Sequence, residues 1–242
     1  MKTKSILFLL TFLLISGMTA ELYGDVFSLW PFSGERLGSD VKNTLQGETL
    51  WTEEIKVNGR TLDMEVTLVQ KTLRDALQDL RAIYKKGTAA ANSNSLLFEI
   101  PLKNGSKQRY YLVELGGIVP MLQFSMHLPA NFKKGKPSHW PQLLPLPPGG
   151  IPETVMEFPK RDSVYAMFST PYQPEQVLSD LTRALQNRGW KNVGGETNTT
   201  PQASGEIFMK ENPLEIVILT ILPPNPQNRM TMGTMYHRKL KK

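Results

Sequence analysis

Hydrophobic and polar positions are most regular between Ser163 and Val193, where they predict a strand, a helix and the start of another strand. Apolar side chains occupy both alternating sets of positions over residues 163–169, as expected of a strand covered on both faces. The following apolar residues have helical spacing and form one stripe: Val177, Leu178, Leu181, Ala184 and Leu185. Pro174 suits the first turn of this helix and Gly189 suits its end, so the helix has a defined start and stop.

The residues at both ends of this helix carry further predictions. Tyr172 or Gln173 is the expected N-cap residue, because each stands just before the first-turn proline. Glu175 lies in the first turn and Arg188 in the last, where the helix dipole favours their charges. Trp190 follows the glycine stop, and we interpret it as an apolar anchor packed on the sheet rather than as a ligand-stacking residue.

The first half of the chain contains a hairpin and a helix of its own. Asn58-Gly59 is a strong signal for a two-residue hairpin turn, and residues 49–57 and 61–68 alternate as half-buried strands on its two sides. A helical stripe follows, and Gly87 is its expected stop. The stripe consists of Leu73, Leu77, Leu80 and Tyr84.

Further strands are predicted in both halves, and together they define a fold class. Ile55 and Met156 are separated by the same offset of 101 residues as Leu77 and Leu178. We therefore predict an α+β fold of two tandem, duplicated ββαβββ units, each an antiparallel sheet with one helix packed on it. A chance recurrence of this pattern is the alternative. The remaining predicted strands cover residues 96–102, 108–115, 118–128, 154–158, 206–210, 214–222 and 230–238.

These patterns divide the chain into consecutive segments. The central segment contains six prolines, so it should be extended, but its apolar residues distinguish it from a solvated linker. We interpret it as a strip that covers a surface, and a proline-rich ligand for another domain is the alternative. The segments are a signal peptide (1–20), an irregular N-terminal arm (21–48), a first α+β unit (49–128), a proline-rich linker (129–150), a second α+β unit (151–238) and a basic tail (239–242).

The N-terminus and the absence of cysteine indicate export. Lys2 and Lys4 precede an apolar run from Ile6 to Met18, as in a signal peptide cut near Ala20, and this run is short for a membrane span. An uncleaved anchor is the alternative. The lack of cysteine excludes disulfides, thiolate metal sites and a lipid-modified cysteine. We expect a protein of the bacterial periplasm, the cell envelope or the secreted fraction, with no transmembrane span after cleavage.

The formal charge of +6 is concentrated at the two ends of the chain. Lys2 and Lys4 leave with the signal peptide, which reduces the charge from +6 to +4. Arg238, Lys239 and the last two lysines supply four positive charges, so the rest of the mature chain sums to zero. This distribution differs from the broad basic stripe of a nucleic-acid-binding protein, and we expect no nucleic-acid partner. The tail is either a solubilising end or a site of weak attraction to an anionic surface.

The sequence contains no recognisable catalytic or metal-binding motif. His127, His139 and His237 are far apart, and we interpret each as a surface or edge imidazole. Asp63 and Glu65 share a strand face and could act as paired acids, but we interpret them as the solvated face of a half-buried strand. We expect no cofactor and no catalytic or metal-binding residue. A carboxylate-dependent hydrolase is the alternative function.

Apolar residues in irregular stretches are the candidate functional residues. Aromatic and aliphatic side chains dominate contact energy when they are buried at interfaces. The sequence therefore predicts a non-catalytic module that binds another envelope protein or a surface component. It does not determine the oligomeric state. Alternatively, these stretches are internal covers. The candidate interaction residues are Phe27, Leu29, Trp30, Phe32, Trp140, Leu143 and Leu144.

Overall fold

The computed structural model describes residues 37–91, 95–114, 121–132, 135–194, 198–200 and 203–240. The expected signal peptide and the cluster from Phe27 to Phe32 lie outside these residues. The described chain forms two compact units. Unit 1 comprises the described parts of Met1–Glu54 and Leu62–Lys133, and unit 2 comprises those of Ile55–Thr61 and Lys134–Lys242.

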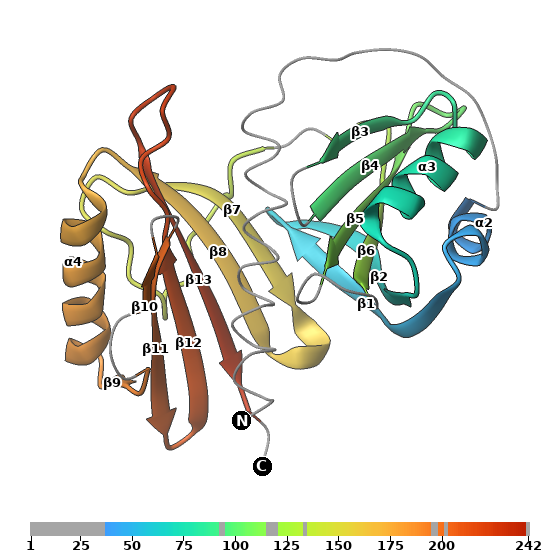
Figure 1. Cartoon of the computed structure of the whole chain (residues 1–242). Helices are drawn as coiled ribbons and strands as arrows, with labels where there is room; N and C mark the ends of the chain where they lie inside the picture. Colours follow the sequence, from blue (N-terminus) through green and yellow to red (C-terminus); the bar gives the residue numbers. More distant parts are fainter. Residues whose placement is uncertain are drawn as a thin grey trace. The chain divides into compact units, whose positions relative to one another are not determined.

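Unit 1 is an antiparallel sheet with two helices (Figure 1). Its strands follow the order β1-β2-β6-β5-β4-β3. The longest ladders join β5 to β4 and to β6, with Tyr110 opposite both Phe98 and Ser125. Its elements are α2 (Leu37–Thr44), β1 (Gly47–Val57), β2 (Arg60–Val69), α3 (Leu73–Ile83), β3 (Thr88–Ala91), β4 (Ser95–Pro101), β5 (Lys107–Glu114) and β6 (Met121–Leu128).

Helix α3 begins at a side-chain cap and buries one face in the core of unit 1. The Thr72 hydroxyl accepts a hydrogen bond from the backbone N–H of Asp75 at 3.2 Å, as N-cap residues do. Leu80 is fully buried, whereas Leu73 and Leu77 pack partly against the same core. The core consists of Val41, Leu45, Val69, Ala76, Leu80, Leu96, Phe98, Ile100, Tyr110, Leu112 and Met121.

Two details of the helices in unit 1 differ from the sequence prediction. Helix α2 lies where no element was predicted, because residues such as Gly38 and Asn43 are poor helix formers. Its Val41 belongs to the core. Helix α3 ends at Ile83, with Tyr84 as its C-cap, before the predicted stop at Gly87. Gly87 is needed for space instead, since a Cβ atom there would lie 2.4 Å from Cζ of Phe98.

Unit 2 is an antiparallel sheet with α4 on one face (Figure 1). Its strands follow the order β10-β11-β12-β13-β8-β7, and β9 pairs with β11. The C-terminal strand β13 therefore lies between β12 and β8. Its elements are β7 (Ile151–Phe158), the 3₁₀ turn η1 (Pro159–Arg161), β8 (Ser163–Thr170), α4 (Pro174–Asn187), β9 (Lys191–Asn192), β10 (Asn198–Thr200), β11 (Ala203–Glu211), β12 (Leu214–Ile221) and β13 (Thr231–Lys239).

The boundaries of α4 confirm the pattern read from the sequence. Gln173 is the N-cap residue, Pro174 begins the helix, and Gly189 has a φ of +80° that suits a left-handed stop. Trp190 is buried, and its backbone N–H donates to the carbonyl of Leu185 at 3.1 Å. The interpretation of Trp190 as an apolar anchor is confirmed.

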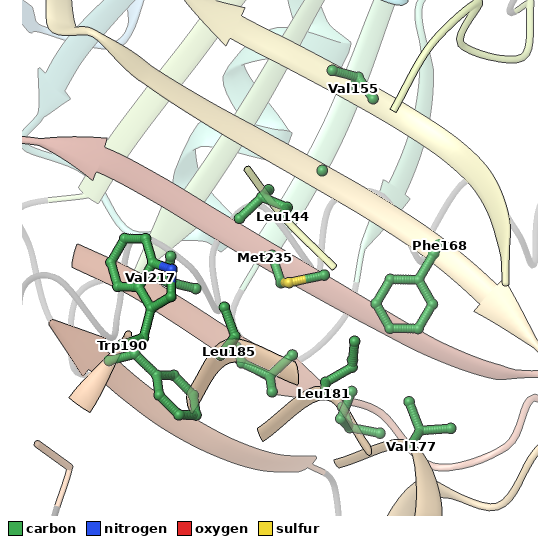
Figure 2. Close-up of a cluster of buried hydrophobic side chains, with 13 residues drawn as sticks. Leu144, Val155, Phe168, Val177, Leu181, Leu185, Trp190, Val217 and Met235 are labelled. Carbon is green, nitrogen blue, oxygen red and sulfur yellow. The ribbon is translucent and has the colours of Figure 1, made fainter. Parts of the chain in front are cut away.

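The core of unit 2 lies between α4 and its sheet. Figure 2 shows Leu181 and Leu185 of the helix on the same side of the strands as Phe168 and Met235. Leu144 lies in this cluster although it belongs to no helix or strand. The buried members are Leu144, Val155, Ala166, Phe168, Val177, Leu181, Leu185, Trp190, Phe208, Val217, Leu219, Ile221 and Met235.

The hairpin turn of the first two strands forms as predicted but belongs to unit 2. Asn58 and Gly59 both have positive φ values, +50° and +79°, as the expected turn type requires. The Asn58 N–H donates to the carbonyl of Val155 at 2.8 Å, and the Asn58 side chain accepts the N–H of Val155 at 2.7 Å. The turn thereby continues the ladder in which Val57 pairs with Met156.

The predicted α+β fold of two tandem ββαβββ units is wrong. The described chain is dominated by antiparallel sheet, with thirteen strands and three α-helices. Extra short strands follow α3 and α4, and the hairpin turn in Ile55–Thr61 groups with the second unit rather than the first. The side-chain pattern misses β3 because this strand is an alanine-rich, mostly exposed segment that is held by backbone pairing with β4.

Candidate functional site

The proline-rich segment folds onto unit 2, where Trp140 and Leu144 hold it to the core. Leu144 is only 2% exposed. The Trp140 ring packs edge-on against Phe168, with ring centroids 6.1 Å apart. The Trp140 indole N–H donates to the carbonyl of Leu144 at 3.0 Å, and the Leu144 N–H donates to the carbonyl of Pro141 at 3.0 Å. This part of the segment is a compact turn with a defined backbone.

Arg188 fastens the same turn from the C-terminal end of α4. Its Nη1 atom donates to the carbonyls of Gln142 and Leu143, each at 3.1 Å. The Leu143 side chain nevertheless points away from the core and is 43% exposed. The exposed Leu143 side chain therefore stands on a backbone that contacts of Trp140 and Arg188 hold in place.

The other end of the segment is fastened at the N-terminal end of α4. The Thr170 hydroxyl donates to the carbonyl of Pro148 at 3.1 Å. Gly149 has a φ of +61°, and a Cβ atom there would lie 3.2 Å from the ring of Tyr172. Tyr172 and Ile151 are two further exposed apolar side chains beside this attachment.

The structure places the predicted interaction residues in different environments. Trp140 and Leu144 pack inward against the core of unit 2, as an internal cover would, whereas Leu143 faces solvent. The other four candidates, Phe27, Leu29, Trp30 and Phe32, lie outside the described residues. A binding role for Leu143 stays a prediction.

A second cluster of polar groups surrounds His237 on β13. The prediction that His237 is a surface or edge imidazole is wrong, because the residue is only 6% exposed. Its Nε2 atom lies 3.4 Å from Oε2 of Glu215 on β12, and its ring packs edge-on against Trp190. The Lys210 ammonium lies over the Trp190 ring, 4.8 Å from its centroid.

The environment of His237 favours its neutral form. Burial lowers the pKa of His237 below the ordinary value of 6.5, and the hydrogen bond and charge of Glu215 partly oppose this shift. Asp162 also raises the pKa, whereas Lys210 lowers it further. His237 and Glu215 thus form a largely buried imidazole–carboxylate pair. The His237 ring packs against Trp190, which belongs to the core.

The carboxylates singled out from the sequence are not joined in an acid pair. Asp63 on β2 is exposed, and Glu65 is half-buried. The Glu65 carboxylate accepts a hydrogen bond from the Thr49 hydroxyl and lies 3.9 Å from Nζ of Lys42. The two other histidines have different surroundings, since His139 lies 3.4 Å from Glu157 and His127 is exposed on β6.

A shallow cavity of about 470 Å³ opens at the start of α3. The Lys71 ammonium forms an ion pair with Asp79 across it. Thr72 and Asp75 are already engaged in capping the helix. Four of the six lining residues are thus engaged with one another in two pairs. The lining residues are Gln70, Lys71, Thr72, Asp75, Gln78 and Asp79.

Metal-ligand clusters and membrane-spanning helices are absent from the described ranges. There, no three or more histidine, aspartate or glutamate side chains come together as a possible metal site. No helix among the described residues has the length and apolar character needed to cross a membrane. The chain matches no protein-family model and no curated protein.

Sequence reasoning missed the two polar contacts that organise these sites. Arg188 was interpreted as a partner of the helix dipole, whereas it binds two carbonyls of the proline-rich segment. His237 and Glu215 stand at the ends of two predicted strands, which is compatible with an antiparallel pair. These positions could have suggested a contact between His237 and Glu215, but the sequence does not specify the register of the two strands.

Proposed function

We propose that this protein is an exported, non-catalytic module that binds a protein or surface component of the cell envelope. Export rests on the basic and apolar residues before Ala20. The proposed binding surface is the turn of Trp140–Leu144, with Leu143 as its apolar anchor. The surface is small, so we expect a partner that supplies a pocket for one or two apolar side chains.

The exposed Leu143 on a fixed backbone is the observation that supports this proposal most directly. Ordering a loop or a side chain on binding reduces affinity, and a surface already held in place avoids part of that cost. Arg188, Trp140 and the buried Leu144 hold this turn from three sides. A partner could therefore bury Leu143 without first ordering the backbone.

A capture experiment with matched leucine variants tests the proposal. The exported form of the protein would be immobilised and exposed to envelope extract, and Leu143→Ala would be compared with Leu50→Ala. The two leucines have nearly equal exposure, 43% and 44%, but Leu50 lies on β1. We expect Leu143→Ala to lose capture of a specific partner and Leu50→Ala to retain it, with both melting temperatures close to that of the unchanged protein.

One result would count against the binding role of Leu143, and another would count against release of the protein by cleavage. Equal capture by Leu143→Ala and the unchanged protein would exclude Leu143 as an anchor. Mass spectrometry of the protein from washed membranes addresses export separately. An intact N-terminus in that fraction would favour an anchored protein over a released one.

The hydrolase alternative would need a histidine or a second acid beside Asp63 or Glu65. The described contacts of Glu65 are instead with Thr49 and Lys42. His139 and His237 face other carboxylates, Glu157 and Glu215. No specific observation favours the hydrolase, so we do not propose it.

A further inference from the structure

The sheet of unit 2 has a second face, turned away from α4, and one row of side chains crosses this face near the end of β13. Met235 belongs to the core beneath α4, so the alternation of the strand places Arg238 on the second face. Ser163 of β8 lies directly opposite Arg238. Phe158 of β7 pairs with Ser163, and Ile216 of β12 pairs with Arg238, which completes the row.

Two polar groups of this row are buried without a hydrogen-bond partner. Nε of Arg238 and Oγ of Ser163 are closed to solvent, and neither forms a hydrogen bond with any part of the chain that the structure describes. Ser163 is only 6% exposed, and Phe158 and Ile216 beside the two groups are buried as well. A buried polar group without a partner costs stability, above all when it carries a charge. Both groups can donate, and both lack an acceptor.

The charge of Arg238 is also unbalanced on this face. Glu157 and Glu215 belong to the neighbouring strands β7 and β12, but each alternates to the face that α4 covers. Asp162, in the turn before β8, is exposed. Among the described residues, no carboxylate forms an ion pair with Arg238. The second face therefore presents one cation between apolar side chains.

A guanidinium beside a hydroxyl suits one carboxylate. Nε and a terminal nitrogen of arginine donate in parallel to the two carboxylate oxygens, and a serine hydroxyl can donate to one of them. A single positive charge matches a single carboxylate, whereas a phosphate dianion would bring excess charge into this apolar row. Phe158 and Ile216 flank the two donors and would contact an apolar group attached to the carboxylate.

The recessed position of the donors favours a small molecule. The Arg238 side chain as a whole is half-buried, so a ligand can approach part of it although Nε is closed to solvent. A flat membrane surface does not reach such a position, but the end of a flexible molecule does. We infer that Ser163 and Arg238 form a binding site for the carboxylate of a small apolar acid, such as a medium-chain fatty acid. This inference goes beyond the proposed function and does not depend on Leu143.

Thermal melts give the first test, with octanoate as the probe. Arg238→Met removes the guanidinium and keeps an apolar stem. Because no partner is lost, the ligand-free variant should melt at or above the temperature of the unchanged protein. Octanoate should raise the melting temperature of the unchanged protein but not that of Arg238→Met. A clear loss of stability in the ligand-free variant would reveal a structural partner of Arg238 and overturn the inference.

A nuclear magnetic resonance titration of the exported form locates the bound carboxylate. The Nε–H signal of Arg238 would be identified by its absence from the spectrum of Arg238→Gln. Octanamide is the neutral analogue of octanoate, and sodium chloride supplies an unrelated anion. We expect a saturable shift of this signal with octanoate alone. An equal shift with octanamide would show an apolar contact only, and an equal shift with chloride would show unspecific anion binding. Either result would overturn the inference.

Calorimetric titrations with octanoate compare matched variants. Ser163→Ala should bind about tenfold more weakly, because it loses one hydrogen bond to a charged group, and Arg238→Gln should bind more weakly still. Lys239→Gln is the control, because it removes the next positive charge of β13 from the other face of the sheet. Equal weakening by Lys239→Gln would overturn the inference, since net charge would then be responsible. These assays contain no partner protein, so their failure is distinguishable from failure of Leu143 to capture one.

Discussion

Nε2 of His237 lies 3.4 Å from Oε2 of Glu215, and the two residues are diagonal neighbours on adjacent antiparallel strands. His237 pairs directly with Val217, so Glu215, two residues earlier on β12, shares its face of the sheet. The contact lies beside Trp190 at the edge of the core. Protonation of His237 would place a second charge in this buried position, which links the stability of unit 2 to pH.

The stability of unit 2 should fall as the medium becomes acidic. The pKa of His237 is lowered in the folded protein, so the unfolded chain binds its proton more readily. The stabilisation from neutral His237 is fully present above the unfolded value of 6.5 and is lost as pH falls through the lowered folded pKa. Thermal melts of the unchanged protein and His237→Gln over this range measure the effect.

The matched control for this experiment is His139→Gln, because the His139 side chain is 59% exposed. We expect the unchanged protein and His139→Gln to share the same acid-dependent loss of stability and His237→Gln to lose less. Parallel pH profiles for all three proteins would show that another group is responsible.

Shortening Leu181 should destabilise unit 2 strongly. This residue of α4 is 1% exposed and packs against side chains of the sheet in the core of unit 2. Leu181→Ala should cost about 2–5 kcal/mol of unfolding free energy, from lost burial and the cavity left behind. Leu143→Ala makes the same chemical change at an exposed position, so we expect a cost within about 0.5 kcal/mol there. Denaturant melts decide, and a similar small cost for Leu181→Ala would contradict its place in the core.

Gly233 on β13 should not tolerate a methyl group. A Cβ atom there would lie 2.2 Å from Cζ of Phe168 and 2.9 Å from Cδ1 of Ile221. Relieving this overlap should cost about 1–3 kcal/mol, as overpacking of cores usually does. Gly135→Ala is the control, because among the described residues, its chain neighbours aside, no atom lies within 4 Å of its Cβ position. A loss confined to Gly233→Ala in thermal melts is the expected outcome, and equal melting temperatures would show that the core adapts.

The local pattern of the sequence predicted individual elements better than their assembly. The stripe of Val177, Leu181 and Leu185 and the stop at Gly189 determine α4, because periodicity and backbone conformation are local properties. The same holds for the turn at Asn58-Gly59. Strand order depends on pairing between distant residues, and single-sequence periodicity does not specify it. The alanine-rich β3 is held by such pairing and was therefore missed.

The candidate site was predictable in composition but not in orientation. Trp140, Leu143 and Leu144 stand out in the sequence because apolar residues interrupt a proline-rich stretch. No periodicity exists there to separate the inward-facing Leu144 from the outward-facing Leu143. The partner that fixes their orientation, Arg188, lies 45 residues further along the chain. Its role depends on the packing of α4 and was outside the reach of local patterns.

Removing the Arg188 guanidinium should loosen the turn that presents Leu143. Arg188→Gln loses the donors to the Gln142 and Leu143 carbonyls, which lie at an exposed position, so the cost in global stability should be at most about 1 kcal/mol. The local effect should be clearer, because the turn then depends on Trp140 and Leu144 alone. Hydrogen exchange of the Leu144 amide, which donates to Pro141, should become several-fold faster.

Arg183→Gln is the matched control, because Arg183 is an exposed arginine of the same helix. Its exchange rate at Leu144 should equal that of the unchanged protein. If Arg188→Gln also leaves this rate unchanged, the core contacts of Trp140 and Leu144 hold the turn without Arg188. If exchange at Leu144 is faster in Arg188→Gln, this variant should also capture the partner less well, because Leu143 is less ordered. The affinity for the partner would then fall mainly through faster dissociation of the complex.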